Sequence, residues 1–268
     1  MKLPPRPELH ARAQVLADRR NPRFLVFVGA ILVALALGFK SELVAPSAVW
    51  WLALGLMLVA APALFAYLRG KEQAARIEHF VPVAIGAVVV AGLSLLITEW
   101  WKFAIFSGAF GLGFLIAAQL DYHRLRGEDR PLDVVVQEAL LAAPLAGAFL
   151  VVLAAPFPLA LRTFWIGILA LFAAYRSFLV LGKPLHPRRA FLIAFFVAQV
   201  VGLAAWAMSS YLPFEEGVFA VMLLLIWYIN RGIFRHVFED TLTRQVLFEY
   251  GAFAALLAYL FFISYHPS

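Results

Sequence analysis

Residues 190–212 read AFLIAFFVAQVVGLAAWAMSSYL, an apolar run that holds no charged side chain. Arg188 and Arg189 directly precede this run, and Pro213 directly follows it. An α-helix rises about 1.5 Å per residue, so about 20 such residues cross the hydrocarbon core of a bilayer. The stretch therefore predicts a helix that spans a membrane.

Eight other stretches meet the same criterion of length and hydropathy, some of them marginally. They are Phe24–Phe39, Val49–Leu68, Phe80–Thr98, Phe103–Leu120, Val134–Ala154, Thr163–Leu181, Val218–Ile233 and Val246–Ser264. The runs that begin at Phe24 and Val218 are short, and we expect each to gain a turn from its flanks. The sequence predicts an all-α, polytopic transmembrane helical bundle of about nine helices.

The composition independently indicates a lipid environment. Of the 268 residues, 64% are hydrophobic and 14% are charged, and the mean hydropathy is +0.88. Soluble domains carry about a quarter charged residues, so this chain is too apolar to cover a surface that faces water. There is no cysteine, which excludes disulfides, thiolate metal sites and cysteine nucleophiles.

The distribution of Lys and Arg predicts the orientation. With a cytoplasmic N-terminus, 18 of the 22 basic residues fall in cytoplasmic segments, whereas Lys40, Lys102 and Arg162 fall outside and Arg176 lies within a helix. This bias follows the positive-inside rule and places the C-terminus outside. We expect residues 1–22 to form a basic cytoplasmic segment and residues 23–268 a single transmembrane domain in the inner (cytoplasmic) membrane.

The same charge distribution bears on partners. The net charge of +6 lies mainly beside the predicted helix ends, a pattern that fits anionic lipid head groups at the cytoplasmic face and argues against nucleic acid. Partner membrane proteins are the other class of partner that the sequence allows.

Polar residues inside the predicted helices form a candidate intramembrane cluster near the cytoplasmic side. Its members are Glu138, Arg176, Asn230, Arg231 and Glu249. Glu138 and Arg176 lie at similar depths on consecutive helices, so we predict that they pair. Charges inside a membrane suggest a pocket for a lipid head group or an ion. The structural alternative, in which these residues join helices, is favoured because the charges lie close to the interface.

Two predicted cytoplasmic loops supply a candidate interfacial site. Its members are Asp121, His123, His236, Glu239 and Asp240. His236 and Glu239 are spaced to share a helical face, but one such motif is weak as a metal or catalytic signal. An amphipathic helix from Phe234 to Leu242 explains the second loop without a metal or catalytic site. The ion pairs Arg235–Glu239 and Asp240–Arg244 would stabilise this helix. The sequence identifies no metal ligands, catalytic residues or cofactor.

The run Phe103–Leu120 carries small residues, among them Ser107, Gly108 and Gly111. Small residues spaced along one helix face let neighbouring helices approach closely. A protease nucleophile at Ser107 would need a histidine at membrane depth, and the sequence predicts none there. We therefore expect this helix to serve close packing.

Three segments resemble a known family. The stretch Ile233–Gly251 is similar to the closing segment of a family of uncharacterised bacterial multi-pass membrane proteins, and Ala207–Pro213 and Asp121–His123 are loosely similar to it. The resemblance covers about the second half of the chain. It implies an all-helical membrane domain of unknown function and supplies no catalytic residues.

The short loops and the lack of a motif favour a non-enzymatic integral membrane subunit or scaffold that associates with lipid or partner proteins. Two alternatives remain at this point. A transporter or flippase would use the inner-leaflet polar cluster, and an enzyme that modifies a lipid or isoprenoid would require the two cytoplasmic loops to converge.

Overall fold

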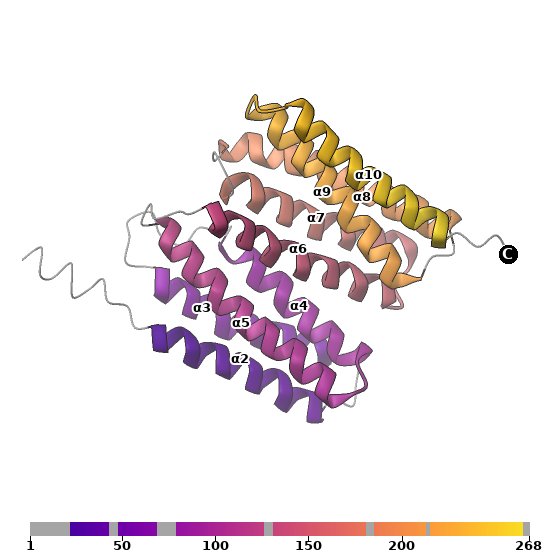
Figure 1. Cartoon of the computed structure of the whole chain (residues 1–268). Helices are drawn as coiled ribbons and strands as arrows, with labels where there is room; N and C mark the ends of the chain where they lie inside the picture. The colour runs from indigo at the N-terminus through magenta and orange to yellow at the C-terminus, as the bar shows by residue number, and fades with distance from the viewer. Residues whose placement is uncertain are drawn as a thin grey trace, which may run out of the picture.

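The computed structural model describes residues 22–42, 48–68, 79–125, 131–180, 185–212 and 215–264. Within these ranges the chain forms nine α-helices and no strand (Figure 1). The helices are α2 (Pro22–Glu42), α3 (Ala48–Leu68), α4 (Val81–Leu96), α5 (Trp100–Leu125), α6 (Pro131–Ala154), α7 (Leu159–Val180), α8 (Pro187–Tyr211), α9 (Glu216–Phe238) and α10 (Arg244–Ser264). The predicted all-α bundle and its helical stretches are confirmed, whereas residues 1–21 of the predicted basic segment lie outside the described residues.

Several helices run beyond their apolar stretches. The two short stretches lengthen into α2 and α9, and α5 continues five residues past its predicted end at Leu120. The prediction of a separate amphipathic helix from Phe234 is wrong, because α9 continues without a break to Phe238. Asp240 then adopts a positive φ of 52°, and Thr241 N donates to His236 O at 3.0 Å. This geometry closes the C-terminus of α9 before α10 begins.

Two hydrophobic cores share helix α4. The first core joins α2, α3, α4 and α5, and the second joins α6, α7, α8 and α9 with the opposite side of α4. Helix α10 packs on α9 at the edge of the bundle, where Figure 1 shows it alongside α9. Because α4 contributes to both cores, it connects the two halves of the molecule.

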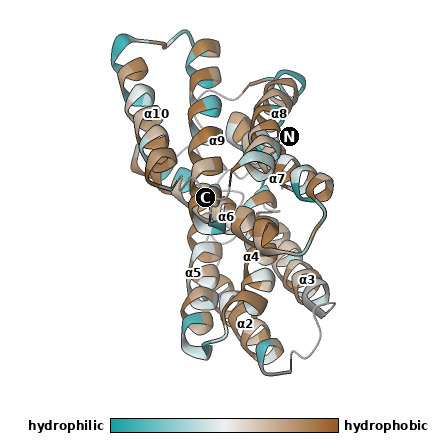
Figure 2. Ribbon diagram, turned by 90° about the vertical axis from the view of Figure 1, so that its right-hand side faces the viewer, coloured by the Kyte–Doolittle hydropathy of each residue, from teal (hydrophilic) through white to brown (hydrophobic). Residues whose placement is uncertain are grey.

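The outer surface of the bundle is apolar. Eight helices of the described chain are long and apolar enough to cross a membrane, and α4 is a shorter apolar helix. Large hydrophobic side chains such as Phe27, Leu203 and Phe262 are exposed on it. Figure 2 shows hydrophobic colour along most of the helical ribbon. A surface of this kind faces lipid, and the protein is a multi-pass membrane protein.

Helix α4 is the shortest of the described helices. Its 16 residues span about 24 Å, less than the ~30 Å hydrocarbon core, and most of its side chains are buried. Carbonyls at the end of a helix in this setting need a donor. Lys40, in the last turn of α2, supplies it: Nζ donates to Ser94 O at 2.5 Å and to Ile97 O at 2.8 Å.

We expect Lys40→Met to lower the free energy of unfolding by about 1–3 kcal/mol, because two carbonyls at the end of α4 lose their donor. Lys102→Met is the matched control, since Lys102 is 46% exposed and forms its ion pair with Glu99, which is exposed as well. Denaturation of the purified protein by increasing SDS measures both changes. Equal stabilities of the two variants would contradict the capping role.

Helices α2 and α5 approach closely at two glycines. A Cβ on Gly111 would lie 2.7 Å from Val33 Cγ2 and 3.2 Å from the carbonyl oxygen of Gly29. A Cβ on Gly108, one turn earlier, would meet nothing within 4 Å. The predicted close packing is therefore present at Gly111 and not at Gly108.

Replacing Gly111 with leucine should lower the free energy of unfolding by about 1–3 kcal/mol, since the backbones of α2 and α5 must separate. Gly108→Leu makes the same change on the same helix in open space and should leave stability close to wild type. Melting temperatures in one detergent compare the two variants. A Gly108 variant as unstable as the Gly111 variant would contradict the role of the α2–α5 contact, because leucine is the better helix former at both positions.

Candidate functional site

Charged and polar side chains gather at one end of the bundle, called here the charged end, where α5, α7 and α9 finish and α4 and α6 begin. Asp121 and Arg176 each lie four residues before the ends of their helices, and Arg231 lies seven before the end of α9. At about 1.5 Å per residue these groups sit roughly 6–10 Å inside the helix ends. They form one charged layer, whose members are His79, Asp121, Gln137, Glu138, Arg176, Ser177, Arg231 and Arg235.

Asp121 is the centre of the first half of this layer. Arg176 Nη2 donates to Asp121 Oδ1 at 3.2 Å and to Oδ2 at 3.4 Å. His79 Nδ1 lies 3.0 Å from Asp121 Oδ2, and Gln137 Nε2 lies 3.5 Å from Oδ1. The Asp121 and Arg176 side chains are each 2% exposed, so this is a buried ion pair.

Glu138 is the centre of the second half. Arg231 donates to Glu138 Oε1 through Nη1 at 3.2 Å and Nη2 at 3.3 Å, and Arg235 Nη1 donates to the same oxygen at 3.1 Å. Arg231 Nη1 also donates to Ser177 Oγ at 2.6 Å. The guanidinium of Arg231 lies over the rings of Trp227 and Tyr228, at 5.3 and 5.4 Å from the ring centroids.

Consecutive residues on α6 and α7 join the two halves of the layer. Gln137 and Arg176 contact Asp121, whereas their neighbours Glu138 and Ser177 contact Arg231. Successive side chains of a helix point about 100° apart, so one helix contributes side chains to both halves of the charged layer. The layer thereby connects α5 of the first core to α7 and α9 of the second.

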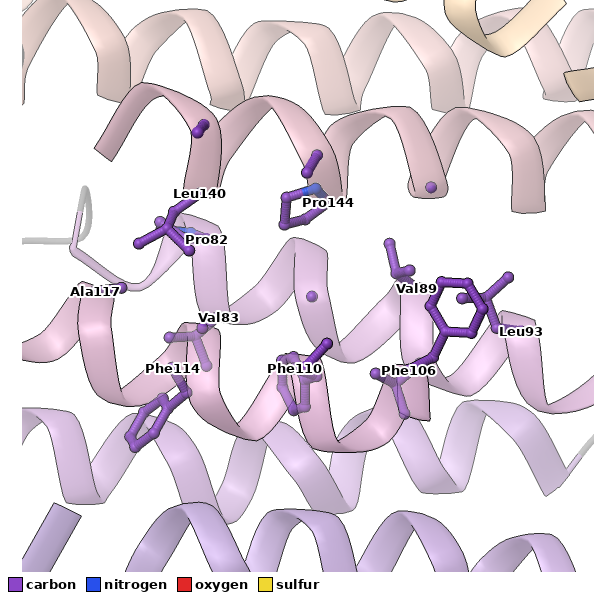
Figure 3. Close-up of a pocket in the computed structure, with 17 residues that line it drawn as sticks. Pro82, Val83, Val89, Leu93, Phe106, Phe110, Phe114, Ala117, Leu140 and Pro144 are labelled. Atoms are coloured by element: carbon purple, nitrogen blue, oxygen red, sulfur yellow. The ribbon is translucent and has the colours of Figure 1, made fainter. Parts of the chain in front are cut away.

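Several cavities lie between the described helices. One of about 160 Å³ lies between α6 and α9 and is lined by Glu138, Arg231, Trp227 and Tyr228 with three apolar residues. A second of about 320 Å³ lies between α4, α5 and α6, and Figure 3 shows its apolar lining, with Phe106, Phe110 and Pro144. A third of about 610 Å³ lies between α3, α4, α6 and α7 and is also apolar.

The predicted intramembrane cluster is only partly assembled. Glu138 and Arg231 are in contact, as predicted for members of one cluster. The prediction that Glu138 pairs with Arg176 is wrong, because Arg176 forms its ion pair with Asp121. Asn230 Nδ2 donates to Ile226 O of its own helix at 2.8 Å. Glu249 is exposed on α10 and forms no ion pair with a described residue of the layer.

In the structure, the two segments that were predicted to form the interfacial site do not contribute to a common site. Asp121 belongs to the buried layer, while His236 Nδ1 lies 2.8 Å from Thr241 Oγ1. Across the described ranges, no hydrogen bond or ion pair connects Asp121 or His123 to His236, Glu239 or Asp240. No group of three or more metal-ligating side chains occurs in the described part of the chain.

The two predicted ion pairs of that segment have different outcomes. Arg235 Nε lies 3.2 Å from Glu239 Oε1, so this pair is confirmed. The Asp240–Arg244 pair is absent from the described structure, because Asp240 leaves the helix in its positive-φ turn and the required helical spacing is lost.

Four residues of the layer belonged to neither predicted site: His79, Gln137, Ser177 and Arg235. His79 is only 6% exposed although it precedes α4. A signal for it exists in the sequence, since it directly adjoins the apolar run that begins at Phe80. Gln137 and Ser177 adjoin Glu138 and Arg176, but adjacency alone does not show which neighbour each residue faces.

Comparison with known proteins places the chain in a wider context. A family model described as a protein of unknown function, DUF5656, matches residues 27–264. No curated protein and no solved structure matches the chain.

Proposed function

The chain belongs to the DUF5656 family of proteins of unknown function, and from its charged layer we propose that it is a non-enzymatic integral membrane subunit or scaffold. The observation that supports this proposal is the buried Asp121–Arg176 pair, which joins α5 of the first core to α7 of the second. Charges used in this way hold helices together, since polar contacts are a main means of helix association in lipid.

Partners of such a subunit would meet its surfaces in two ways. In the orientation favoured by the basic residues, the charged end faces the cytoplasm. Arg188, Arg189 and Arg244 are exposed there and suit anionic lipid head groups of the inner membrane. The apolar sides of the bundle suit partner membrane proteins.

Native mass spectrometry of the protein released from its own membrane in mild detergent tests the proposal. A partner protein retained at fixed stoichiometry would support the subunit role and identify the process that it serves. A chain that is always alone would contradict it. Variants of Asp121 that keep their yield and fold but lose a transport or enzymatic activity would also contradict it.

Transport is the second candidate function, and the 160 Å³ cavity beside Glu138 and Arg231 is the observation that favours it. A transport route requires water or substrate to reach these charges. The chain has no cysteine, so Ala142→Cys places one thiol at the cavity wall. Reaction with a membrane-impermeant maleimide would support a route, and a thiol that never reacts would exclude one through this cavity. Ser107→Cys, buried in the first core, is the unreactive control.

A further inference from the structure

Helix α10 is covered by the rest of the molecule on one side only. Figures 1 and 2 show it at the edge of the bundle beside α9. The rings of Tyr250 and Phe253 lie 6.0 and 5.0 Å, between centroids, from the ring of Tyr228 on α9. From Arg244 to Ile263, Tyr250 is the only buried residue. Most of the surface of α10 is therefore open to lipid or to another helix.

Glu249 lies inside the part of α10 that spans the membrane. The 21 residues of this helix extend over about 32 Å, which matches the ~30 Å hydrocarbon core. Arg244 begins the helix at the charged end, so Glu249, five residues later, lies about 8 Å inside that end. This is the depth of the charged layer, whose members lie roughly 6–10 Å inside their own helix ends.

The carboxylate of Glu249 differs from the two carboxylates of the charged layer. Asp121 and Glu138 each form ion pairs with arginines of the same chain. Glu249 is exposed on α10 and forms no hydrogen bond or ion pair within the described part of the chain. Charged side chains inside a membrane almost always face a protein interior and are paired there. The donor that Glu249 requires therefore has to come from a neighbouring molecule.

The exposed residues in line with Glu249 form one stripe along α10, called here the Glu249 face. After Glu249 they follow at intervals of three and four residues: Ala252, Leu256, Tyr259 and Ile263. This spacing keeps side chains on one side of a helix and is the spacing by which two helices pack together. The same intervals, one residue later, describe the face that packs toward α9: Tyr250, Phe253, Leu257 and Leu260. Helix α10 thus carries two packing stripes, and the described chain covers one of them.

Charge selects the molecule that fits the Glu249 face. A second copy bound about a two-fold axis would place its own Glu249 opposite the first at the same depth, because such an interface is symmetric. Two carboxylates that meet in this way repel each other. A helix with a basic side chain at this depth avoids the repulsion and supplies the missing donor. The small side chain of Ala252, one turn along the face, lets such a helix approach closely.

We propose that the Glu249 face docks a transmembrane helix of a different protein, one that carries a lysine or arginine about 8 Å inside its end on the same side of the membrane. The basic side chain donates to the Glu249 carboxylate, and apolar side chains of the partner pack along Leu256, Tyr259 and Ile263. The inference rests on the proposed subunit role and adds to it the face and the charge by which the partner is recognised.

Synthetic helices test the charge of the partner. Each is a single-span peptide of leucine and alanine that carries a dansyl group and has lysine, leucine or glutamate at one position, about 8 Å from its end. The peptides contain no tryptophan, so energy transfer from the tryptophans of the full chain to the dansyl group in one detergent measures binding. One charge-assisted hydrogen bond corresponds to about tenfold in affinity, so the lysine helix should bind about tenfold more tightly than the leucine helix. Equal binding of these two helices, or preference for the glutamate helix, would overturn the proposal.

Variants of the chain locate the binding. Glu249→Gln should abolish the preference for the lysine helix, and Glu249→Lys should reverse it in favour of the glutamate helix. Glu99→Gln removes an exposed carboxylate elsewhere and should leave the preference unaltered. Ala252→Trp obstructs the Glu249 face and should weaken binding severalfold, whereas Ala258→Trp, the same change at an exposed position on another side of α10, should not. A preference that survives Glu249→Gln, or equal weakening by the two tryptophan variants, would overturn the proposal.

Sedimentation in detergent tests a second copy as the occupant. We expect wild type and Glu249→Gln to have the same mass, and a wild-type dimer that Glu249→Gln converts to a monomer would overturn the proposal. The peptide assay uses the purified chain without any natural partner. Its outcome is therefore independent of the retained partner protein that tests the subunit role.

Discussion

Asp121→Asn is expected to lower the free energy of unfolding by about 3–5 kcal/mol, the cost of removing one charge from a buried ion pair. The substitution keeps the shape of the side chain and removes only its charge. Arg176, whose side chain is 2% exposed, then keeps a positive charge inside the bundle without the carboxylate that compensates it. SDS denaturation monitored by tryptophan fluorescence measures the loss.

A double substitution separates the ion pair from packing. When Asp121→Leu and Arg176→Met are combined, neither buried charge remains, and much of the lost stability should return. Glu99→Gln removes a carboxylate that is 48% exposed and should change stability by less than about 1 kcal/mol. A folded Asp121→Asn protein as stable as the Glu99→Gln control would refute the structural role of the pair.

Hydropathy predicted the helices well because a backbone in lipid has few conformations that satisfy its hydrogen-bonding groups. A segment that crosses the hydrocarbon must satisfy its own N–H and C=O groups, so an apolar run of about 20 residues becomes a helix. Helix ends are less constrained by this rule. Helix α5 continues past Leu120 to Leu125, and Asp121, expected in a loop, instead lies in its last turns.

The ion pairs were harder to predict, because the depth of a residue in the membrane does not determine which neighbouring helix its side chain faces. Glu138 and Arg176 lie at similar depths, as expected from their positions in α6 and α7. Their facing directions depend on how each helix is rotated about its axis, and one residue changes that direction by about 100°. Arg176 therefore faces Asp121 on α5, while its neighbour Ser177 faces Arg231 on α9. A single sequence does not fix these rotations.

Removal of the Arg231 charge is the second large effect that we expect. Arg231→Met should lower the free energy of unfolding by about 2–3 kcal/mol, because Ser177 and Glu138 each lose the donor that Arg231 of α9 supplies. The loss is smaller than at Asp121, since Glu138 is 26% exposed and keeps Arg235 as a partner. Arg189→Met, at an exposed position on α8, should stay within about 0.5 kcal/mol of wild type.

Arg231→Lys distinguishes the shape of the guanidinium from its charge. Arg231 uses two nitrogens toward Glu138, one of which also reaches Ser177, while its plane lies over Trp227 and Tyr228. A lysine ammonium is a single point charge that does not reproduce this planar fork. The lysine variant should therefore recover only part of the stability lost in Arg231→Met. Full recovery, measured by the same SDS denaturation, would mean that charge alone joins α9 to α6 and α7.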